Sequence, residues 1–206
     1  MTTFPGSPTT LRGALVCVDY QSLTPLAVVP FQYNPHTLTR SFELKIGVSG
    51  PEAGQIGHAP NESIKLELEL DATDGLSDEA DTHGIAPRLA ALEELVSRHS
   101  SAVLDGLMML NFGTIEIVPP TTKLTLFIWG PKRVMPVVIT ELSVVEEAHD
   151  RNLNPLRARV SLGLRALNWN DVSQTHPAFG IALAHKMRTE AMALIGNLQA
   201  QQVINF

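Results

Sequence analysis

The sequence has little of what stabilises small secreted proteins or anchors membrane proteins. Cys17 is its one cysteine, so no disulfide can form within the chain, and synthesis in a reducing compartment is expected. The thiol lies in the apolar run 15–18, where a small buried side chain is the ordinary interpretation. The N-terminus lacks the basic start and apolar stretch of a signal peptide, and no apolar run approaches the roughly 20 residues that span a bilayer. We therefore expect no signal peptide and no direct membrane insertion by this chain.

Basic and aromatic residues are also scarce. Lys and Arg number 15 against 21 Asp and Glu, a net charge of −6, which disfavours a general nucleic-acid binder because phosphates attract cations. With 2 Trp and 2 Tyr, an aromatic platform for sugars is hard to build. The apolar fraction of 44% is that of an ordinary globular protein, and 206 residues suffice for one domain with a core.

No familiar catalytic or ligand-binding motif occurs. The zinc-protease pattern His-Glu-x-x-His, the dinucleotide and P-loop glycine patterns, paired Cys-x-x-Cys and the nucleophile elbow are absent. The acidic stretch 71–81 lacks the glycine and glutamate spacing of a calcium loop, and the 7 histidines are scattered. We expect a protein that is not an enzyme, with no catalytic residue, metal or cofactor, although groups from distant positions can still converge in a fold.

Alternating hydrophobicity dominates the chain up to about residue 168. The clearest case is 64–70, where four aliphatic residues alternate with Lys65, Glu67 and Glu69, the pattern of a half-buried strand. Prolines at positions 25 and 30 favour strand ends or sheet edges. Strands are predicted at 11–18, 26–33, 38–46, 64–70, 115–118, 123–129, 137–147 and 156–167.

The last two predicted strands form a long antiparallel hairpin. Their connection, 149–155, is rich in Asn and Asp and ends in a proline, which favours a turn. In 156–167 apolar residues face one way and arginines the other. Because Glu141, Ser143 and Glu147 share one phase of the first arm, acidic and basic side chains are expected to pair across the strands.

Two stretches change to helical periodicity. Apolar residues from Ile85 to Val96 predict a helix of about 14 residues with Pro87 in its first turn. A second helix is predicted from near Pro177. Its apolar stripe consists of Phe179, Leu183, Met187, Leu194 and Leu198. The predicted fold class is therefore mainly β with helices, in two parts: a β domain at 1–170 and a C-terminal helical extension at 171–206.

Three segments together resemble one family. They are Phe31-Gln32-Tyr33-Asn34-Pro35 leading into 38–42, the strand 64–70 running into 71–74, and the closing hairpin with its segments 136–143 and 152–158. In this combination the sequence resembles the N-terminal domain of contractile injection system tube proteins, which are related to phage tail-tube proteins. The resemblance covers roughly residues 10–168.

The resemblance implies a phage tail-tube-like antiparallel β-barrel or sandwich with one internal α-helix. It also implies a structural protein without an active site, namely the tube-initiator or spike-adaptor layer of a phage-tail-like particle. Copies would form a homohexamer, a ring that joins the spike-bearing hub to the inner tube subunits, with baseplate or sheath subunits as further partners. Such particles are assembled in the bacterial cytoplasm, and some are released and act outside the cell.

We expect three segments to contact a neighbouring subunit or layer, the second of them in the Gly- and Pro-rich loop 47–60. Their residues are Phe31, Tyr33, Asn34, Pro35, Gly50, Pro51, Gln55, Ile56, Asn152, Leu153, Asn154 and Pro155. Many relatives continue into a LysM-type module, whereas this sequence ends after one helix. The stripe from Phe179 to Leu198 is therefore expected to dock on a partner, with packing on the parent domain as the alternative.

The competing hypothesis for the whole chain is a monomeric β-barrel or sandwich that binds a small ligand or carbohydrate in a concave apolar pocket.

Overall fold

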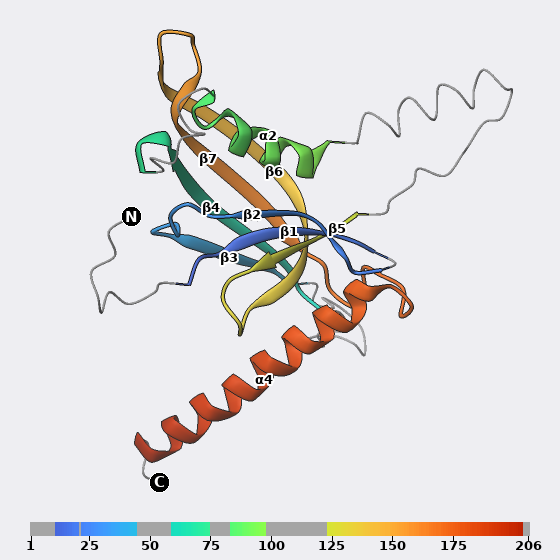
Figure 1. Ribbon diagram of the computed structural model, residues 1–206. Helices are drawn as coiled ribbons and strands as arrows, with labels where there is room; N and C mark the ends of the chain where they lie inside the picture. Colours follow the sequence, from blue (N-terminus) through green and yellow to red (C-terminus); the bar gives the residue numbers. More distant parts are fainter. Residues whose placement is uncertain (1–10, 21, 45–58, 75–82, 98–122, 204–206) are drawn as a thin grey trace, which may run out of the picture.

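The chain is mainly β, and a computed structural model describes its residues 11–20, 22–44, 59–74, 83–97 and 123–203 (Figure 1). The strands are β1 (Ala14–Asp19), β2 (Pro25–Pro30), β3 (Leu38–Glu43), β4 (Asn61–Asp71), β5 (Lys123–Ile128), β6 (Val134–His149) and β7 (Pro155–Ala166). The helices are α2 (Ala86–Val96) and α4 (Pro177–Val203), and a short 3-10 helix, η1 (Ala72–Asp74), follows β4. The prediction of a mainly β fold with helices is confirmed for this part of the chain.

The strands form one antiparallel sheet in the order β2-β1-β5-β6-β7-β4-β3. The sheet is not closed into a barrel, because β2 and β3 lie at its two ends and no pairing between described residues joins them. Of the expected barrel or sandwich, the described residues therefore show an antiparallel sheet that is not closed into a barrel. Part of the reason lies in β2, which begins at Pro25 and ends at Pro30, two residues that cannot donate a hydrogen bond to a further strand.

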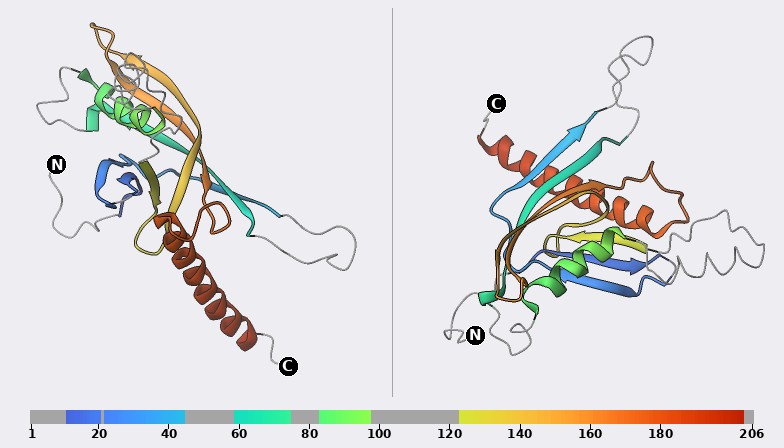
Figure 2. Two further views of the ribbon diagram at one scale, coloured as in Figure 1. Left: turned by 90° about the vertical axis from the view of Figure 1, so that its right-hand side faces the viewer. Right: turned by 90° about the horizontal axis from the view of Figure 1, so that it is seen from above.

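β6 is the longest of these strands and changes partners along its length. Up to Val137 it pairs with β5, and from there to His149 it pairs with β7. The register shifts between Ile139 and Glu141, which leaves Thr140 as the extra residue of a β-bulge. A bulge bends and twists its strand, so the two halves of the sheet turn relative to each other (Figure 2).

The main core lies between the two halves of the sheet and α2. Leu15 and Phe31 come from the β1–β2 half, and Ile64 and Val160 come from the β4–β7 half, yet all four belong to one buried cluster. Leu89 brings α2 into the same cluster. Burying one such side chain contributes about 1.5–3 kcal/mol, so this shared core fixes the halves in their bent arrangement.

The strongest alternation in the sequence gave a correct prediction. In β4, Ile64 and every second residue to Leu70 are buried, while Lys65, Glu67 and Glu69 between them are exposed. The long hairpin is confirmed as β6 and β7. β6 extends beyond its predicted bounds at both ends, whereas β7 has the predicted length but begins and ends one residue earlier. α2 has 11 residues and starts after the buried Ile85, so it is shorter than predicted. The predicted strand 115–118 and residues 47–58 of the predicted loop lie outside the described residues.

α4 projects away from the sheet (Figure 1). Its first turns pack on the sheet, where Ala178 and Ala182 are buried and Ala178 forms a small second cluster with Val18 and Leu124. From residue 183 to residue 200 all side chains except His185 are exposed. Among the described helices, none is both long and apolar enough to cross a membrane.

Candidate assembly surfaces

The outer face of β4, β6 and β7 carries a row of ion pairs. Arg159 on β7 reaches Glu67 on β4 at 3.1 Å and Glu147 on β6 at 2.8 Å. Arg157 donates to the Asp71 carboxylate through Nε at 2.9 Å and Nη2 at 2.7 Å. The predicted pairing of acidic and basic side chains across the hairpin is confirmed by the Arg159–Glu147 pair. Arg157 and Arg159 also form ion pairs with residues of β4. The opposite face of β7 is buried, so the hairpin has one charged face and one apolar face.

Asp71 is held in place by both its side chain and its backbone. The hydroxyl of Thr73 donates to its carboxylate at 2.6 Å and the Thr73 amide at 2.8 Å. These bonds, followed by that from Arg157, lower the pKa of Asp71 to about 2. Gln32 donates to the Asp71 carbonyl at 2.7 Å and accepts from the Asp71 amide at 3.0 Å. Because Arg88 of α2 also donates to Gln32 Oε1, Gln32 joins the segment after β2 to β4 and α2.

The tip of the hairpin is built around Asp150. Its carboxylate accepts hydrogen bonds from the amides of Asn152 at 2.7 Å and Asn154 at 2.8 Å, and from the Asn154 side chain at 2.8 Å. The bonds from Asn154 and Asn152 lower the pKa of Asp150. Leu153 follows with a φ of 64° and 79% of its surface exposed. A left-handed leucine costs roughly 1–2 kcal/mol, and a strained, exposed apolar residue at a hairpin tip is a candidate contact point.

The last residues of the tip also position α2. The carbonyl of Pro155 accepts a hydrogen bond from the Ile85 amide at 2.8 Å. Gly84 makes this approach possible, because it has a φ of +58° and a Cβ there would lie 2.1 Å from the Pro155 oxygen. Asn154 and Pro155 therefore have roles within the chain, whereas Leu153 projects into solvent.

The segment 31–35 divides in the same way. Phe31 is 1% exposed and packs against Phe127 and Trp129, so it belongs to the core and not to a surface. The side chain of Asn34 accepts from the Gly13 amide at 2.9 Å and donates to the Leu11 carbonyl at 2.8 Å. Asn34 is nevertheless exposed, as is Tyr33, and Pro35 is half-buried.

The two end strands of the sheet carry exposed apolar side chains. On β2 these are Leu26 and Val28, and at β3 they are Phe42 and the following Leu44, each slightly more than half exposed. The guanidinium of Arg40 lies 5.0 Å from the centre of the Phe42 ring, a cation–π contact. Unpaired strand edges with apolar side chains are places where another strand can add.

The predicted stripe on α4 is largely exposed. Phe179 is half-buried near the start of the helix, but Leu183, Met187, Leu194 and Leu198 are between 42% and 65% exposed. The alternative to docking, in which the whole stripe packs on the parent domain, does not occur, because these side chains are exposed. Met192 and Ile195 are also about half exposed, so the apolar surface continues around the free end of α4.

A small pocket lies where α4 meets the sheet. Its walls include Met135, Trp169 and the Arg40–Glu62 ion pair, and its volume is about 150 Å³. Nδ1 of His185, which lines the pocket, is buried without a hydrogen-bond partner, and burial lowers the pKa of this histidine. Sites for drug-sized ligands usually measure about 300–1,000 Å³, so this pocket is too small for such a ligand.

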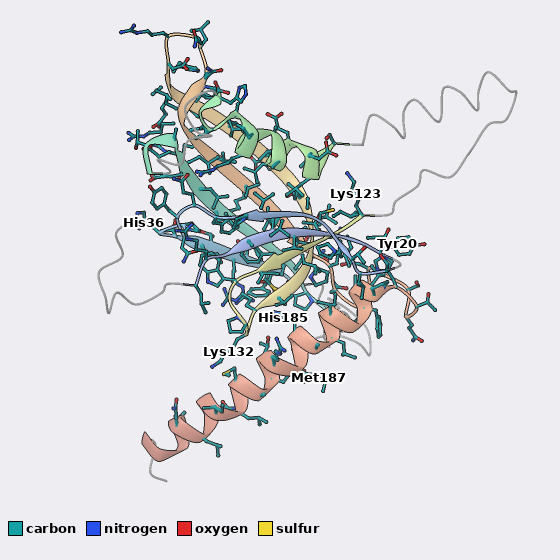
Figure 3. All side chains as sticks on the ribbon, viewed as in Figure 1. Tyr20, His36, Lys123, Lys132, His185 and Met187 are labelled. Atoms are coloured by element: carbon teal, nitrogen blue, oxygen red, sulfur yellow. The ribbon has the colours of Figure 1, made fainter. Side chains whose placement is uncertain are left out.

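A wider basic groove of about 620 Å³ lies between the β5–β6 turn and α4. Its cationic side chains are Arg40, Lys132, Arg133 and Arg188, with His185 beside them. Figure 3 shows Lys132 and His185 where the turn approaches the helix. Arg188 donates to the Pro131 carbonyl at 3.1 Å, which ties α4 to the turn. Burial, and then repulsion from Arg40, lower the pKa of Arg133, so the groove concentrates positive charge.

The structure places the predicted contact residues at two opposite ends of the molecule. Tyr33 lies beside Glu69 and Arg157, at the end of β4 and β7 nearest the hairpin tip, whereas α4 lies at the other end (Figure 1). Gly50, Pro51, Gln55 and Ile56 lie outside the described residues. The sequence did not predict the basic groove, because its cations come from three separate segments and no local pattern links them.

Comparison with models of known protein families found no match, and comparison with curated proteins found none either.

Proposed function

We propose that this chain is a structural subunit that assembles edge to edge into a ring at the base of the inner tube of a contractile injection particle. The observation that carries the proposal is the open sheet, whose end strands β2 and β3 both carry exposed apolar side chains. The sequence resemblance supports the kind of particle, the homohexameric state and the role of a tube initiator or spike adaptor.

The two edges differ, which favours a closed ring over a two-fold dimer. A contact between β2 of one copy and β3 of the next is heterologous, and such contacts close into rings when the rotation between copies allows it. Ring closure removes free edges that otherwise promote open-ended aggregation. The charged face of the β6–β7 hairpin is suited to water, and we assign it to the lumen of the ring.

The partners follow from this arrangement. One face of the ring receives the spike or hub protein and the other receives inner tube subunits, so assembly of the tube starts on this layer. α4 supplies an exposed apolar helix for a further contact, with a baseplate or sheath subunit as the partner. We place this assembly in the bacterial cytoplasm, before any release of the particle.

The experiment is electron microscopy of particles from a strain that lacks this chain. The proposal predicts hubs and sheaths without attached inner tubes, and complementation with the intact chain restores the tubes. Particles with normal tubes contradict it.

The competing function, a monomer that binds a small ligand or carbohydrate, has one observation in its favour, the pocket beside His185. Its volume of about 150 Å³ leaves room for a few water molecules or a very small molecule. Size measurement in solution separates the two functions: a ring supports assembly, whereas a compact monomer with a saturable small ligand supports the alternative.

A further inference from the structure

The basic groove holds positive charge that the described residues neutralise only in part. Among the described residues that line it there is no carboxylate, and there are four cations: Arg40, Lys132, Arg133 and Arg188. Glu62 pairs with Arg40 at 2.5 Å, but in the part of the chain that the structure describes no ion pair reaches the other three cations. In a chain with 21 acidic and 15 basic residues, such a cluster is not expected from composition alone.

Bringing these cations together opposes folding. Burial lowers the pKa of Arg133, repulsion from Arg40 lowers it further, and attraction to Glu62 acts in the opposite direction. Lys186 and Glu190, also on α4, pair with each other at 3.5 Å and add no net charge. The cations come from β3, the β5–β6 turn and α4, so the fold and not a local run of the sequence places them side by side. Concentrated charge of one sign in a groove is typical of a site for a ligand of opposite charge.

The groove has a defined shape because α4 is tied to the β5–β6 turn. Arg188 donates to the Pro131 carbonyl at 3.1 Å, and a guanidinium has five N–H donors, so most of them stay free for a ligand. His185 lies where the turn approaches the helix (Figure 3), and its buried Nδ1 has no hydrogen-bond partner among the described residues. Turn and helix therefore line one space with polar groups held at a set spacing.

The lining indicates the chemistry of the ligand. Guanidinium groups match the oxygens of phosphate with two parallel hydrogen bonds, and a lysine adds a point charge. The volume of about 620 Å³ is that of a site for an organic molecule, roughly 300–1,000 Å³, and not of a site for one small ion. Trp129, Ala191 and Met192 add an apolar wall. The Trp129 ring is stacked on Phe127 with 5.9 Å between ring centres, so this wall is rigid.

We infer that the basic groove binds a chain of two or more phosphate groups, with the phosphate oxygens on Lys132, Arg133 and Arg188. Two sources share this chemistry: free polyphosphate, and a nucleotide whose organic part lies on the wall of Trp129 and Met192. A ligand of this kind bridges the β5–β6 turn and α4, so it strengthens the attachment of the helix. The site is complete within one chain, and the inference therefore goes beyond the proposed function and does not rest on it.

Two double variants test the site. The groove variant carries Lys132→Gln and Arg188→Gln, and glutamine at position 188 keeps a donor for the Pro131 carbonyl. The control, Lys65→Gln with Arg151→Gln, loses one lysine and one arginine as well, but these exposed side chains lie on β4 and at the hairpin tip. Circular dichroism and thermal melting establish that each variant folds. Lys132→Gln alone, at an exposed turn residue, serves as a milder groove variant.

Isothermal titration calorimetry of the full chain at about 0.1 M salt measures the binding of tripolyphosphate, inorganic phosphate and adenosine triphosphate. We expect one tripolyphosphate per chain, bound at least about tenfold more tightly than inorganic phosphate, because it reaches several cations at once. The groove variant is expected to bind tripolyphosphate at least about tenfold more weakly than the wild type. The control should stay within about twofold of the wild type, because salt screens distant exposed charges.

Hydrogen exchange locates the bound ligand. Tripolyphosphate is expected to slow exchange of the backbone amides at 129–133 and 185–192, which flank the groove, and to leave the hairpin tip at 149–155 unchanged. Protection at the tip and not at the groove overturns the inference.

The nucleotide arm distinguishes the two sources. Tighter binding of adenosine triphosphate than of tripolyphosphate assigns a nucleotide, and Met192→Ser should then weaken the nucleotide alone. Equal or weaker binding assigns free polyphosphate. The inference is overturned by a wild type that binds tripolyphosphate no better than inorganic phosphate, by a groove variant that binds like the wild type, or by a control that loses as much affinity as the groove variant. A single-stranded oligonucleotide that binds more tightly than both probes rejects it in favour of a nucleic-acid surface.

Discussion

Gly163 of β7 faces the bulge in β6, and the two strands can approach there because glycine has no side chain. It is buried opposite the bulge, and a Cβ there would lie 2.9 Å from Glu141 Cβ and 3.1 Å from Thr140 Oγ1. The Glu141 Cβ is bonded directly to the backbone and cannot swing aside. The approach of β7 to the bulge therefore requires glycine.

We predict that Gly163→Ala lowers the free energy of unfolding by about 1–3 kcal/mol, the usual cost of overpacking. Urea denaturation measures it. The matched control is Gly180→Ala in α4, where a Cβ meets nothing within 4 Å, and where alanine is expected to stabilise the helix by up to about 1 kcal/mol. Equal effects of the two substitutions would argue against a tight contact at the bulge.

Asp71 makes stability depend on acid pH. Its pKa of about 2 in the folded chain is below the value of about 3.9 in an unfolded chain. The carboxylate therefore stabilises the fold fully above about pH 4, and this contribution is lost as the pH falls toward 2.

For Asp71→Asn we expect a loss of about 1 kcal/mol at neutral pH, after allowance for solvent screening of a surface ion pair. Urea denaturation at several pH values is the measurement. The difference between wild type and variant should shrink as the pH falls through the range between 4 and 2. A difference that stays constant down to pH 2 shows that the charge of Asp71 is not the cause.

At the scale of elements, α4 has an exposed apolar surface that we expect a partner to cover. Leu194 and Leu198 are 65% and 63% exposed, so they contribute little to the stability of the isolated chain. Deleting residues 172–206 would also remove Ala178 and Ala182, which are buried against the sheet. Substitution at the free end of the helix is therefore the cleaner test.

The double variant Leu194→Glu with Leu198→Glu is expected to change the free energy of unfolding by no more than about 0.5 kcal/mol. Incorporation of the chain into particles should nevertheless fall strongly, as measured by immunoblotting of purified particles. Asn197→Asp with Gln199→Glu adds the same charge at polar positions of the same helix and should incorporate normally. Normal incorporation of the leucine variant rejects docking through α4.

Elements with a strong local pattern were predictable, and their long-range arrangement was not. Alternation fixed the faces of β4 and β7, and helical spacing placed α2 and α4. Alternation does not determine whether the end strands of a sheet meet, because closure depends on cumulative bend and twist, and here the bulge at Thr140 changes both. The apolar stripe predicted the helix α4, but it did not predict whether other residues of the chain would cover the stripe. Phe31 was expected at an interface, yet it is buried in the core of the chain.

At the scale of the whole molecule, the unpaired edges make a direct prediction about neighbouring copies. Val28→Cys and Phe42→Cys variants are prepared separately, mixed, and treated with a short thiol crosslinker. The native Cys17 is buried, so it should not interfere. Because each variant carries one new thiol, a β2-to-β3 crosslink in the mixture must join two copies.

The expected result is a crosslinked dimer that forms much faster in the mixture than in either variant alone, as resolved by denaturing gel electrophoresis. Leu153→Cys mixed with Val28→Cys provides the control, since the hairpin tip is not part of the edge contact. Equal yields in both mixtures would exclude specific edge pairing.

The small overlap between β5 and β6 has a mechanical consequence. A pull applied across the sheet from β2 to β3 passes through each strand junction in turn. β5 and β6 share four residue pairs. One of these pairs includes Pro136, which has no amide hydrogen to donate. β6 and β7 share eleven pairs. Among the junctions from β1 to β7, tension in an assembled ring would thus first open the one between β5 and β6, and the buried side chains that bridge the two halves would set the force at which it yields.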